Sequence, residues 1–261
     1  MKSISGETSL SYAYSLNNLG ALYESMGQYE KAEQLFLQAK EIRKNILGET
    51  HPDYVITLNH LAWLYMRKGQ YEKAEPLNLQ AIEITKKASG ENPLHYVTSL
   101  NSAAVLYKIL GQYTKAKALY ITTREILKNV IGEKHPDYAT SLHNLGELYI
   151  TMGEYEKAEP LCIQSNQIWK TTLGEAHPLY ASSLNKLASL YKNMGQYEKA
   201  EKLYLQAKEI RKKILGEAHP KYAESLSELG ILYARMGQYK KAEPLYIEAS
   251  EIQKECGPEK S

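Results

Sequence analysis

The chain has 261 residues, 43% of them hydrophobic, and its 32 basic and 30 acidic residues give a formal net charge of +2. This even balance argues against a nucleic-acid partner, because proteins that bind phosphate backbones concentrate Lys and Arg in a basic stripe. The two cysteines, Cys162 and Cys256, lie far apart and form no CxxC motif. We therefore expect no disulfide framework and no metal cluster. No apolar run is long enough to cross a membrane, so we expect a cytoplasmic protein without a membrane partner.

One short segment recurs every 42 residues, and at Gly69 it reads Gly-Gln-Tyr-Glu-Lys-Ala-Glu-Pro-Leu. Its six copies begin at Gly27, Gly69, Gly111, Gly153, Gly195 and Gly237. A fixed period in this range is typical of a stacked repeat protein, in which each repeat buries its apolar face against its neighbours. The repeat also explains the 22 tyrosines beside a single Phe, since Tyr columns serve first as packing features with the hydroxyl at an edge.

Each repeat predicts two helices. In the second repeat, apolar residues from Tyr54 to Tyr65 recur at helical spacing. His51-Pro52-Asp53 marks the start of this first helix, and Gly69 suits its C-terminal cap. A second helix is expected to begin near Tyr71 and to be closed by Gly90. Pro76, Pro160 and Pro244 fall inside the second helices, where we expect them to be tolerated.

These signals predict an all-α solenoid of six helix-turn-helix repeats and twelve helices, forming one domain over residues 1–261. The repeats span residues 6–47, 48–89, 90–131, 132–173, 174–215 and 216–257. The first repeat has Ser9-Leu10-Ser11-Tyr12 in place of the His-Pro start, and no further amphipathic helix follows the sixth. Because natural solenoids usually end in a polar cap, we expect either an excised segment or an end that stacks on another molecule.

The row Leu19, Gly20, Tyr23, Gly27, Tyr29, Ala32, Phe36 and Ala39 resembles the tetratricopeptide repeat. The 42-residue period, with Ala74-Glu75-Pro76-Leu77 and Leu215-Gly216-Glu217-Ala218-His219-Pro220, resembles the kinesin light chain subclass. The resemblance implies a right-handed superhelix whose first helices line a concave groove for an extended peptide or a partner protein. It implies no catalysis by the repeats, and the missing coiled-coil heptads leave cargo transport unsupported. Asn78 and Cys162 replace a large aromatic residue of the family, so we expect looser packing there.

The face of the first helix opposite its core is expected to line that groove. One position on this face reads Asn17, Asn59, Asn101, His143, Asn185 and Ser227 through the repeats. An amide can donate to and accept from the backbone of an extended peptide. The alternative is that these residues bond neighbouring helices inside the stack. Trp63 is the expected anchor, unless it is partly buried against the next repeat. The predicted ligand-binding set is Asn17, Asn59, Trp63, Arg67, Asn101, Lys108, His143, Asn185, Lys192 and Arg235.

A second column is apolar in every repeat and lies on the second helix, roughly opposite its core line. It contains Leu37, Leu79, Ile121, Ile163, Leu205 and Ile247. These residues either pack against the neighbouring second helix or form an exposed stripe used for self-association.

The recurring histidines do not indicate a metal site. His51, His135, His177 and His219 occur once per repeat, so equivalent atoms should lie about 10 Å apart, whereas zinc ligands lie within about 2 Å of the ion. We expect them to cap the helices that follow. No GxSxG, GxxxxGK[ST], HExxH or EF-hand motif occurs. We therefore expect neither an enzyme nor a cofactor.

The sequence favours an interaction scaffold that binds a protein or peptide ligand in its groove. The alternative is a self-assembling repeat module, a homo-oligomer formed through its terminal repeats or the apolar stripe. RNA binding is disfavoured by the neutral charge. The near identity of residues 27–49 and 195–217 leaves open whether the array is a recent natural expansion or an engineered one.

Overall fold

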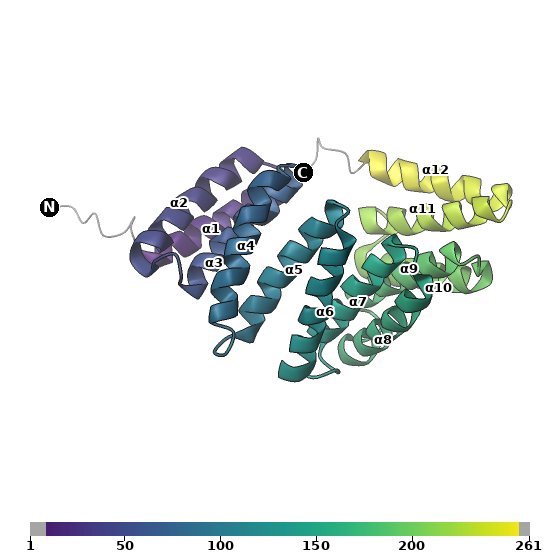
Figure 1. Ribbon diagram of the computed structural model, residues 1–261. Helices are drawn as coiled ribbons and strands as arrows, with labels where there is room; N and C mark the ends of the chain where they lie inside the picture. The colour runs from purple at the N-terminus through teal and green to yellow at the C-terminus, as the bar shows by residue number, and fades with distance from the viewer. Residues whose placement is uncertain (1–8, 256–261) are drawn as a thin grey trace. The chain divides into compact units, whose positions relative to one another are not determined.

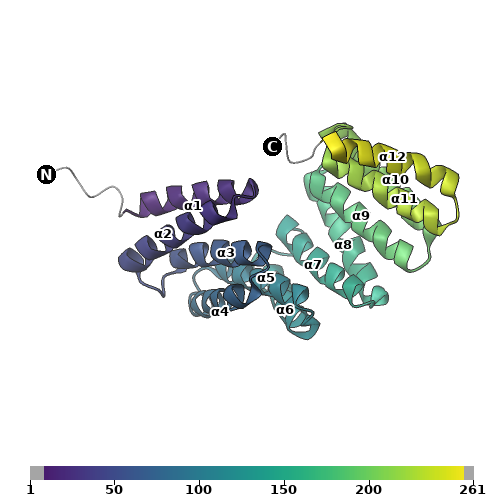
Figure 2. The ribbon, with the colours of Figure 1, turned by 90° about the horizontal axis from the view of Figure 1, so that it is seen from above.

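The computed structural model describes residues 9–255, and within them the chain forms twelve α-helices and no strand. The helices are α1 (Leu10–Ser25), α2 (Tyr29–Leu47), α3 (Pro52–Arg67), α4 (Tyr71–Lys87), α5 (Pro93–Ile109), α6 (Tyr113–Val130), α7 (Pro136–Thr151), α8 (Tyr155–Leu173), α9 (Pro178–Asn193), α10 (Tyr197–Leu215), α11 (Pro220–Arg235) and α12 (Tyr239–Glu255). Each repeat contributes one pair of adjacent helices (Figures 1 and 2). The predicted all-α array of six helix-turn-helix repeats is confirmed.

Histidine caps begin four of the first helices, as predicted. In α3, α7, α9 and α11 the histidine Nδ1 atom accepts a hydrogen bond from the backbone N–H two residues later, and Pro occupies the first turn. Proline suits this position because its missing N–H would have no intrahelical partner. In α1 the Ser9 hydroxyl accepts from the N–H of Tyr12 at 3.1 Å instead. Among the described residues, no group of three or more His, Cys, Asp or Glu side chains is placed to hold a metal ion.

The turn between paired helices depends on glycine. Gly69 has a φ of 70°, and the N–H of Gln70 donates to the carbonyl of Tyr65 at 2.8 Å. This is the Schellman-type ending for which glycine is favoured, because a side chain is strained at positive φ. The second helices begin at the Tyr of each copy, as predicted, and α4, α8 and α12 continue through their internal prolines. Helix α4 ends at Lys87, three residues before the expected Gly90.

Within a pair, a large side chain of the second helix packs on a small residue of the first. A Cβ atom on Gly20 would lie 2.6 Å from the Phe36 ring, so only glycine leaves room for this contact. Gly230 stands in the same relation to Tyr246, with a Cβ distance of 2.9 Å. The smaller side chains at this position, Asn78 and Cys162, are also buried.

Successive repeats are joined by a recurring hydrogen bond. A tyrosine hydroxyl near the end of the first helix donates to a glutamate of the preceding second helix, at 2.6–3.0 Å. The pairs are Tyr65 with Glu33, Tyr107 with Glu75, Tyr191 with Glu159, and Tyr233 with Glu201. Burial and the neighbouring carboxylate raise the pKa of Tyr65, Tyr191 and Tyr233 to about 12. The hydroxyls therefore stay protonated and remain donors at neutral pH.

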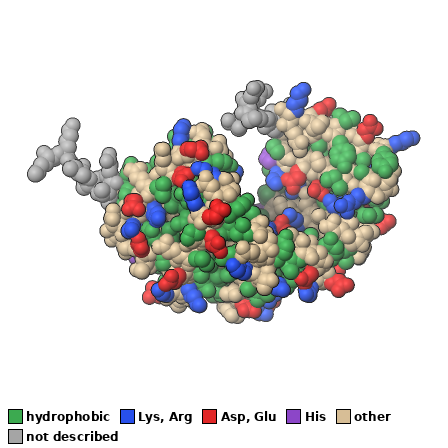
Figure 3. All heavy atoms as spheres, turned by 45° about the horizontal axis from the view of Figure 1, so that its top comes forward, with side chains coloured by type: hydrophobic (Ala, Val, Ile, Leu, Met, Phe, Trp, Pro, Cys, Tyr) green, Lys and Arg blue, Asp and Glu red, His purple; other side chains and the backbone are tan. Residues whose placement is uncertain are grey.

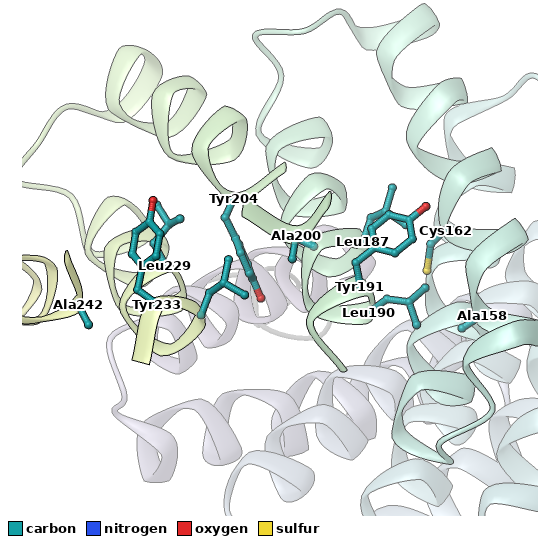
Figure 4. Close-up of a cluster of buried hydrophobic side chains, with 12 residues drawn as sticks. Ala158, Cys162, Leu187, Leu190, Tyr191, Ala200, Tyr204, Leu229, Tyr233 and Ala242 are labelled. Atoms are coloured by element: carbon teal, nitrogen blue, oxygen red, sulfur yellow. The ribbon is translucent and has the colours of Figure 1, made fainter. Parts of the chain in front are cut away.

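Leucines fill the space beside these hydrogen bonds. Figure 4 shows one such cluster, in which Tyr204 of α10 lies between Ala200 and the Leu229 and Tyr233 side chains of α11. Tyr204 is fully buried and Leu229 is 1% exposed. The core of the array is thus a series of small clusters between neighbouring repeats, as expected for a stack.

The chain divides into two compact units of three repeats each, residues 1–130 and 131–261. In the first unit, α1 to α6 pack successively, and the first helices α1, α3 and α5 touch one another in order. In the second unit, α7 to α12 pack in the same way. None of the described helices is long and apolar enough to cross a membrane.

Candidate functional site

A pocket opens between the first helices α3 and α5 in the first unit. Its volume is about 340 Å³, and its lining residues are Pro52, Val55, Ile56, Asn59, His60, Trp63, His95, Thr98 and Ser102. The predicted anchor Trp63 contributes one wall and is 44% exposed. An apolar pocket with a few polar groups is the usual form of a ligand site. We call the exposed surface that Ile56, Asn59, His60, Trp63 and Arg67 form on α3, together with its exposed counterparts on the other first helices, the first-helix face.

The pocket has a neutral aromatic floor on the side of α3. The His60 ring stacks on the buried Phe36 ring, with ring centroids 5.0 Å apart and planes inclined by 16°. Burial, together with the charge of Arg43, lowers the pKa of His60 from its ordinary value of 6.5. The imidazole is therefore uncharged at neutral pH and offers an aromatic surface to an apolar group.

Amide and hydroxyl groups surround this apolar surface. Ser102 donates to Asn78 Oδ1 at 2.7 Å, which fixes the hydroxyl at the pocket wall. The Oδ1 atoms of Asn59 and Asn101 are enclosed and accept no hydrogen bond from any described residue. An enclosed acceptor without a donor is costly, so these two amides are points of stored cost on the first helices.

Beyond Trp63, the first-helix face becomes cationic. The Arg67 guanidinium lies over the Tyr29 ring, 5.6 Å from its centroid, and donates to the Tyr29 hydroxyl at 3.2 Å. Burial raises the pKa of nearby Glu24, although the charge of Arg67 opposes this change. Lys108 of α5 is half-buried. The predicted residues Asn59, Trp63 and Arg67 thus come together on α3, beside Asn101 and Lys108 of α5.

Asn17 does not lie on the exposed first-helix face, although it is the sequence equivalent of Asn59. It is 3% exposed and bonds the Thr57 hydroxyl at 3.4 Å. Thr57 also accepts a hydrogen bond from Arg43 Nη1 at 2.5 Å, and Arg43 is itself fully buried beneath the Tyr14 ring. Asn17 therefore follows the alternative that the sequence left open, a residue that bonds the neighbouring helix inside the stack.

Asn185 follows the same alternative in the second unit. It is 7% exposed, and with its amide oriented to satisfy both groups it accepts from Arg211 Nη1 at 2.8 Å. Arg211 also donates to the Ser225 hydroxyl at 2.9 Å. Arg43 and Arg211 occupy equivalent positions four repeats apart. A buried arginine next to the column therefore draws its asparagine into the stack.

The other predicted residues of the second unit are Lys192, His143 and Arg235, and Lys186 lies on the same helix as Lys192. Lys192 is 7% exposed and forms an ion pair with Glu228 at 2.7 Å. Lys186 pairs with Glu147 at 2.5 Å. His143 lies against the buried Trp169 ring, with centroids 5.2 Å apart. Arg235 is exposed at the end of α11. The first-helix face of this unit is therefore more polar and already charge-paired.

The apolar column on the second helices is exposed in five of its six members. Leu37, Leu79, Ile163, Leu205 and Ile247 are 38–52% exposed, and Ile121 is half-buried. Figure 3 shows apolar side chains at the surface, interspersed with Lys, Arg, Asp and Glu on the visible face. The column is thus available for contact, although nothing in the described residues packs across it to identify a partner.

Several residues that line the pocket were not predicted to do so from the sequence. Ile56 and His60 belong to the helix face that the periodicity identified, but His95, Thr98 and Ser102 face them from the next repeat. Their selection depends on how α5 packs on α3. The only sequence signal for them is the 42-residue offset, which places Thr98 and Ser102 at the positions of Ile56 and His60.

Comparisons with known proteins agree with this architecture. A family model of the tetratricopeptide repeat matches residues 11–87, 96–161, 147–207 and 179–255. The structure is similar to that of BtubC (BKLC) from P. vanneervenii, with 22% identity over 90% of this chain and 92% of that chain and a TM-score of 0.72. This likeness concerns the fold.

A second likeness is to the nearly identical TPR-like repeats of a putative kinesin light chain from Podosopora anserina, with 29% identity, 81% and 99% of the two chains covered and a TM-score of 0.67. No curated protein sequence matches the chain. Because the family model covers most of the residues in six successive helix pairs, the chain belongs to the tetratricopeptide repeat family, and its repeats are similar to those of the putative kinesin light chain.

Proposed function

We propose that the chain is an interaction module that holds an extended peptide segment of a partner protein on the first-helix face of its first unit. Tetratricopeptide repeat proteins generally act as protein-interaction scaffolds. The observation that carries the more specific proposal is the pocket between α3 and α5. It has room for one large apolar side chain, and Trp63 is exposed at its wall.

The mechanism follows from the chemistry around the pocket. An aliphatic or aromatic side chain of the peptide enters between Trp63 and the neutral His60 ring. The amide of Asn59, which lines the pocket, offers its nitrogen as a donor to the peptide backbone, because its oxygen is enclosed. Arg67 adds positive charge at one end of the segment. The second unit contributes less, because its lysines already form ion pairs with Glu147 and Glu228.

Trp63 provides a direct test. A library of random short peptides is selected on the chain, and the enriched sequences are titrated while Trp fluorescence is recorded. Trp63 is 44% exposed whereas Trp169 is 2% exposed, so a blue shift on binding reports Trp63. Trp63→Ala should weaken the selected peptides by more than about tenfold, as expected for an aromatic anchor. Leu79→Ala, which changes an exposed side chain of a second helix, is the matched control.

Two outcomes would contradict the proposal. Selected peptides could bind Trp63→Ala as tightly as the wild type, or they could lose affinity on Leu79→Ala instead. Either result would place binding outside the pocket.

A further inference from the structure

The first helix α1 exposes side chains that are buried in the later first helices of each unit. Leu22 is 54% exposed, whereas the equivalent Leu64, Leu106, Leu190 and Leu232 are fully buried. Leu19 is 41% exposed, against 1% for both Leu61 and Leu229. Met26 and Tyr23 lie on the same side and complete what we call the N-terminal end face. Each of these residues has the type used for packing on a preceding repeat.

The last helix α12 exposes the complementary positions. Tyr246 is 40% exposed, whereas Phe36 and Tyr204 at the same position are fully buried under the following first helix. Glu243 is exposed, whereas the equivalent Glu33, Glu75, Glu159 and Glu201 each accept a hydrogen bond from the tyrosine of the next repeat. Glu243 and Tyr246 form what we call the C-terminal end face.

The two end faces match the internal contact between repeats five and six. There Tyr204 shares one buried cluster with Leu229, Leu232 and Tyr233, and Figure 4 shows Tyr204 beside Leu229 and Tyr233. Tyr233 also donates to Glu201 at 2.6 Å. Leu19, Leu22 and Tyr23 repeat the three residues of α11, and Tyr246 and Glu243 repeat the two residues of α10. At these five positions the two ends are thus identical to the internal contact.

We propose that the N-terminal end face of one copy of the chain packs on the C-terminal end face of a second copy, with the Tyr23 hydroxyl donating to the Glu243 carboxylate. The occupant is a second copy because it carries both the leucines and the tyrosine that the C-terminal end face receives inside the array. A face that met only water would be expected to have polar residues at these positions.

This contact is heterologous, because each copy uses two different surfaces. Copies therefore add head to tail and form chains or rings, whose mass rises with concentration. Each end face lies within one unit, so the contact requires no particular arrangement of the two units. It also leaves the pocket between α3 and α5 outside the contact.

The test measures the mass of the full chain by sedimentation velocity over a range of concentrations. We expect the wild type to grow with concentration, and Leu22→Glu and Tyr246→Glu each to remain monomeric. Mixing Leu22→Glu with Tyr246→Glu tests directly whether the two end faces bind each other. Each retains the end face that the other lacks, so an equimolar mixture should form a dimer and stop there. Leu79→Glu, on the exposed apolar column of the second helices, is the matched control and should associate like the wild type.

Two milder substitutions keep the test interpretable if Leu22→Glu or Tyr246→Glu misfolds. Tyr23→Phe and Glu243→Gln leave the exposed shapes almost unchanged, and each should weaken association by about tenfold, the effect of one hydrogen bond to a charged group. A double-mutant cycle should show that the two effects are not additive. The proposal is overturned if the wild type stays monomeric at all concentrations, if the mixture of Leu22→Glu and Tyr246→Glu contains only monomers, or if Leu79→Glu abolishes growth.

Discussion

The leucine column on the first helices allows one substitution to be compared in two environments. Leu190 of α9 is fully buried in the cluster with Tyr204 and Leu187, whereas Leu22 of α1 is 54% exposed at the equivalent position. We predict that Leu190→Ala destabilises the chain strongly and that Leu22→Ala does not. The helix position and the residue type are the same, so the difference reports packing against the preceding repeat.

The magnitude follows from burial. Removing a fully buried leucine side chain loses its transfer free energy and leaves a cavity, which together cost about 3 kcal/mol. At Leu22 about half of the side chain is already in water and no closed cavity forms, so the loss should stay below about 1 kcal/mol.

Urea unfolding followed by far-UV circular dichroism measures both losses. The buried Trp169 adds a fluorescence probe in the same unit as Leu190. The protein is kept dilute so that association does not add to the stability of the wild type. Equal losses for Leu22→Ala and Leu190→Ala would refute the reasoning, because they would show that the neighbouring repeat contributes nothing to the burial of this column.

Two further predictions concern a close contact and an ion pair. Gly20→Ala should lower the free energy of unfolding by about 1–3 kcal/mol in a thermal or urea melt, because the added Cβ would lie 2.6 Å from the Phe36 ring. A partial rescue by Phe36→Leu would identify this clash as the cause. The pKa of Glu228 lies below its ordinary value of 4.5, because hydrogen bonds from Lys192 and Tyr204 outweigh the effect of burial, which alone would raise it. This stabilisation is present above about pH 4.5 and is lost as the pH falls through the folded-state pKa. On acidification, Glu228→Gln should therefore lose less stability than the wild type, whereas the exposed control Glu198→Gln should follow the wild type. If Glu228→Gln also followed the wild-type pH profile, the pair would contribute nothing to stability.

Local signals made most of the fold predictable. The His-Pro start and the glycine turn act within a few residues, so the first helices begin at Pro52, Pro136 and their equivalents and end before Gly69 and Gly153. The six-fold period then implied stacking, because one helix pair cannot bury its apolar face alone. Helix α4 ends at Lys87, three residues before the expected Gly90, and Gly90 does not take the positive φ of the glycines that end the first helices.

The candidate site was only partly predictable, because its residues come from different repeats. The sequence placed Asn17, Asn59, Asn101 and Asn185 in one column, but it could not separate those on the first-helix face from those inside the stack. That division depends on residues of other helices, since Arg43 bonds Thr57, the partner of Asn17, and Arg211 bonds Asn185 itself. Trp63 and Trp169 differ for a similar reason, because Trp169 is buried and donates to the carbonyl of Pro136 at 3.2 Å.

The sequence by itself therefore determined the helices, their turns and the existence of the stack, because these follow from backbone caps and apolar periodicity within 42 residues. Only the tertiary structure decided which side chains line the pocket between α3 and α5 and which leucines and tyrosines of α1 and α12 are exposed. Those outcomes depend on the volumes and hydrogen bonds that meet when one repeat packs on the next, and a single repeat does not contain that information.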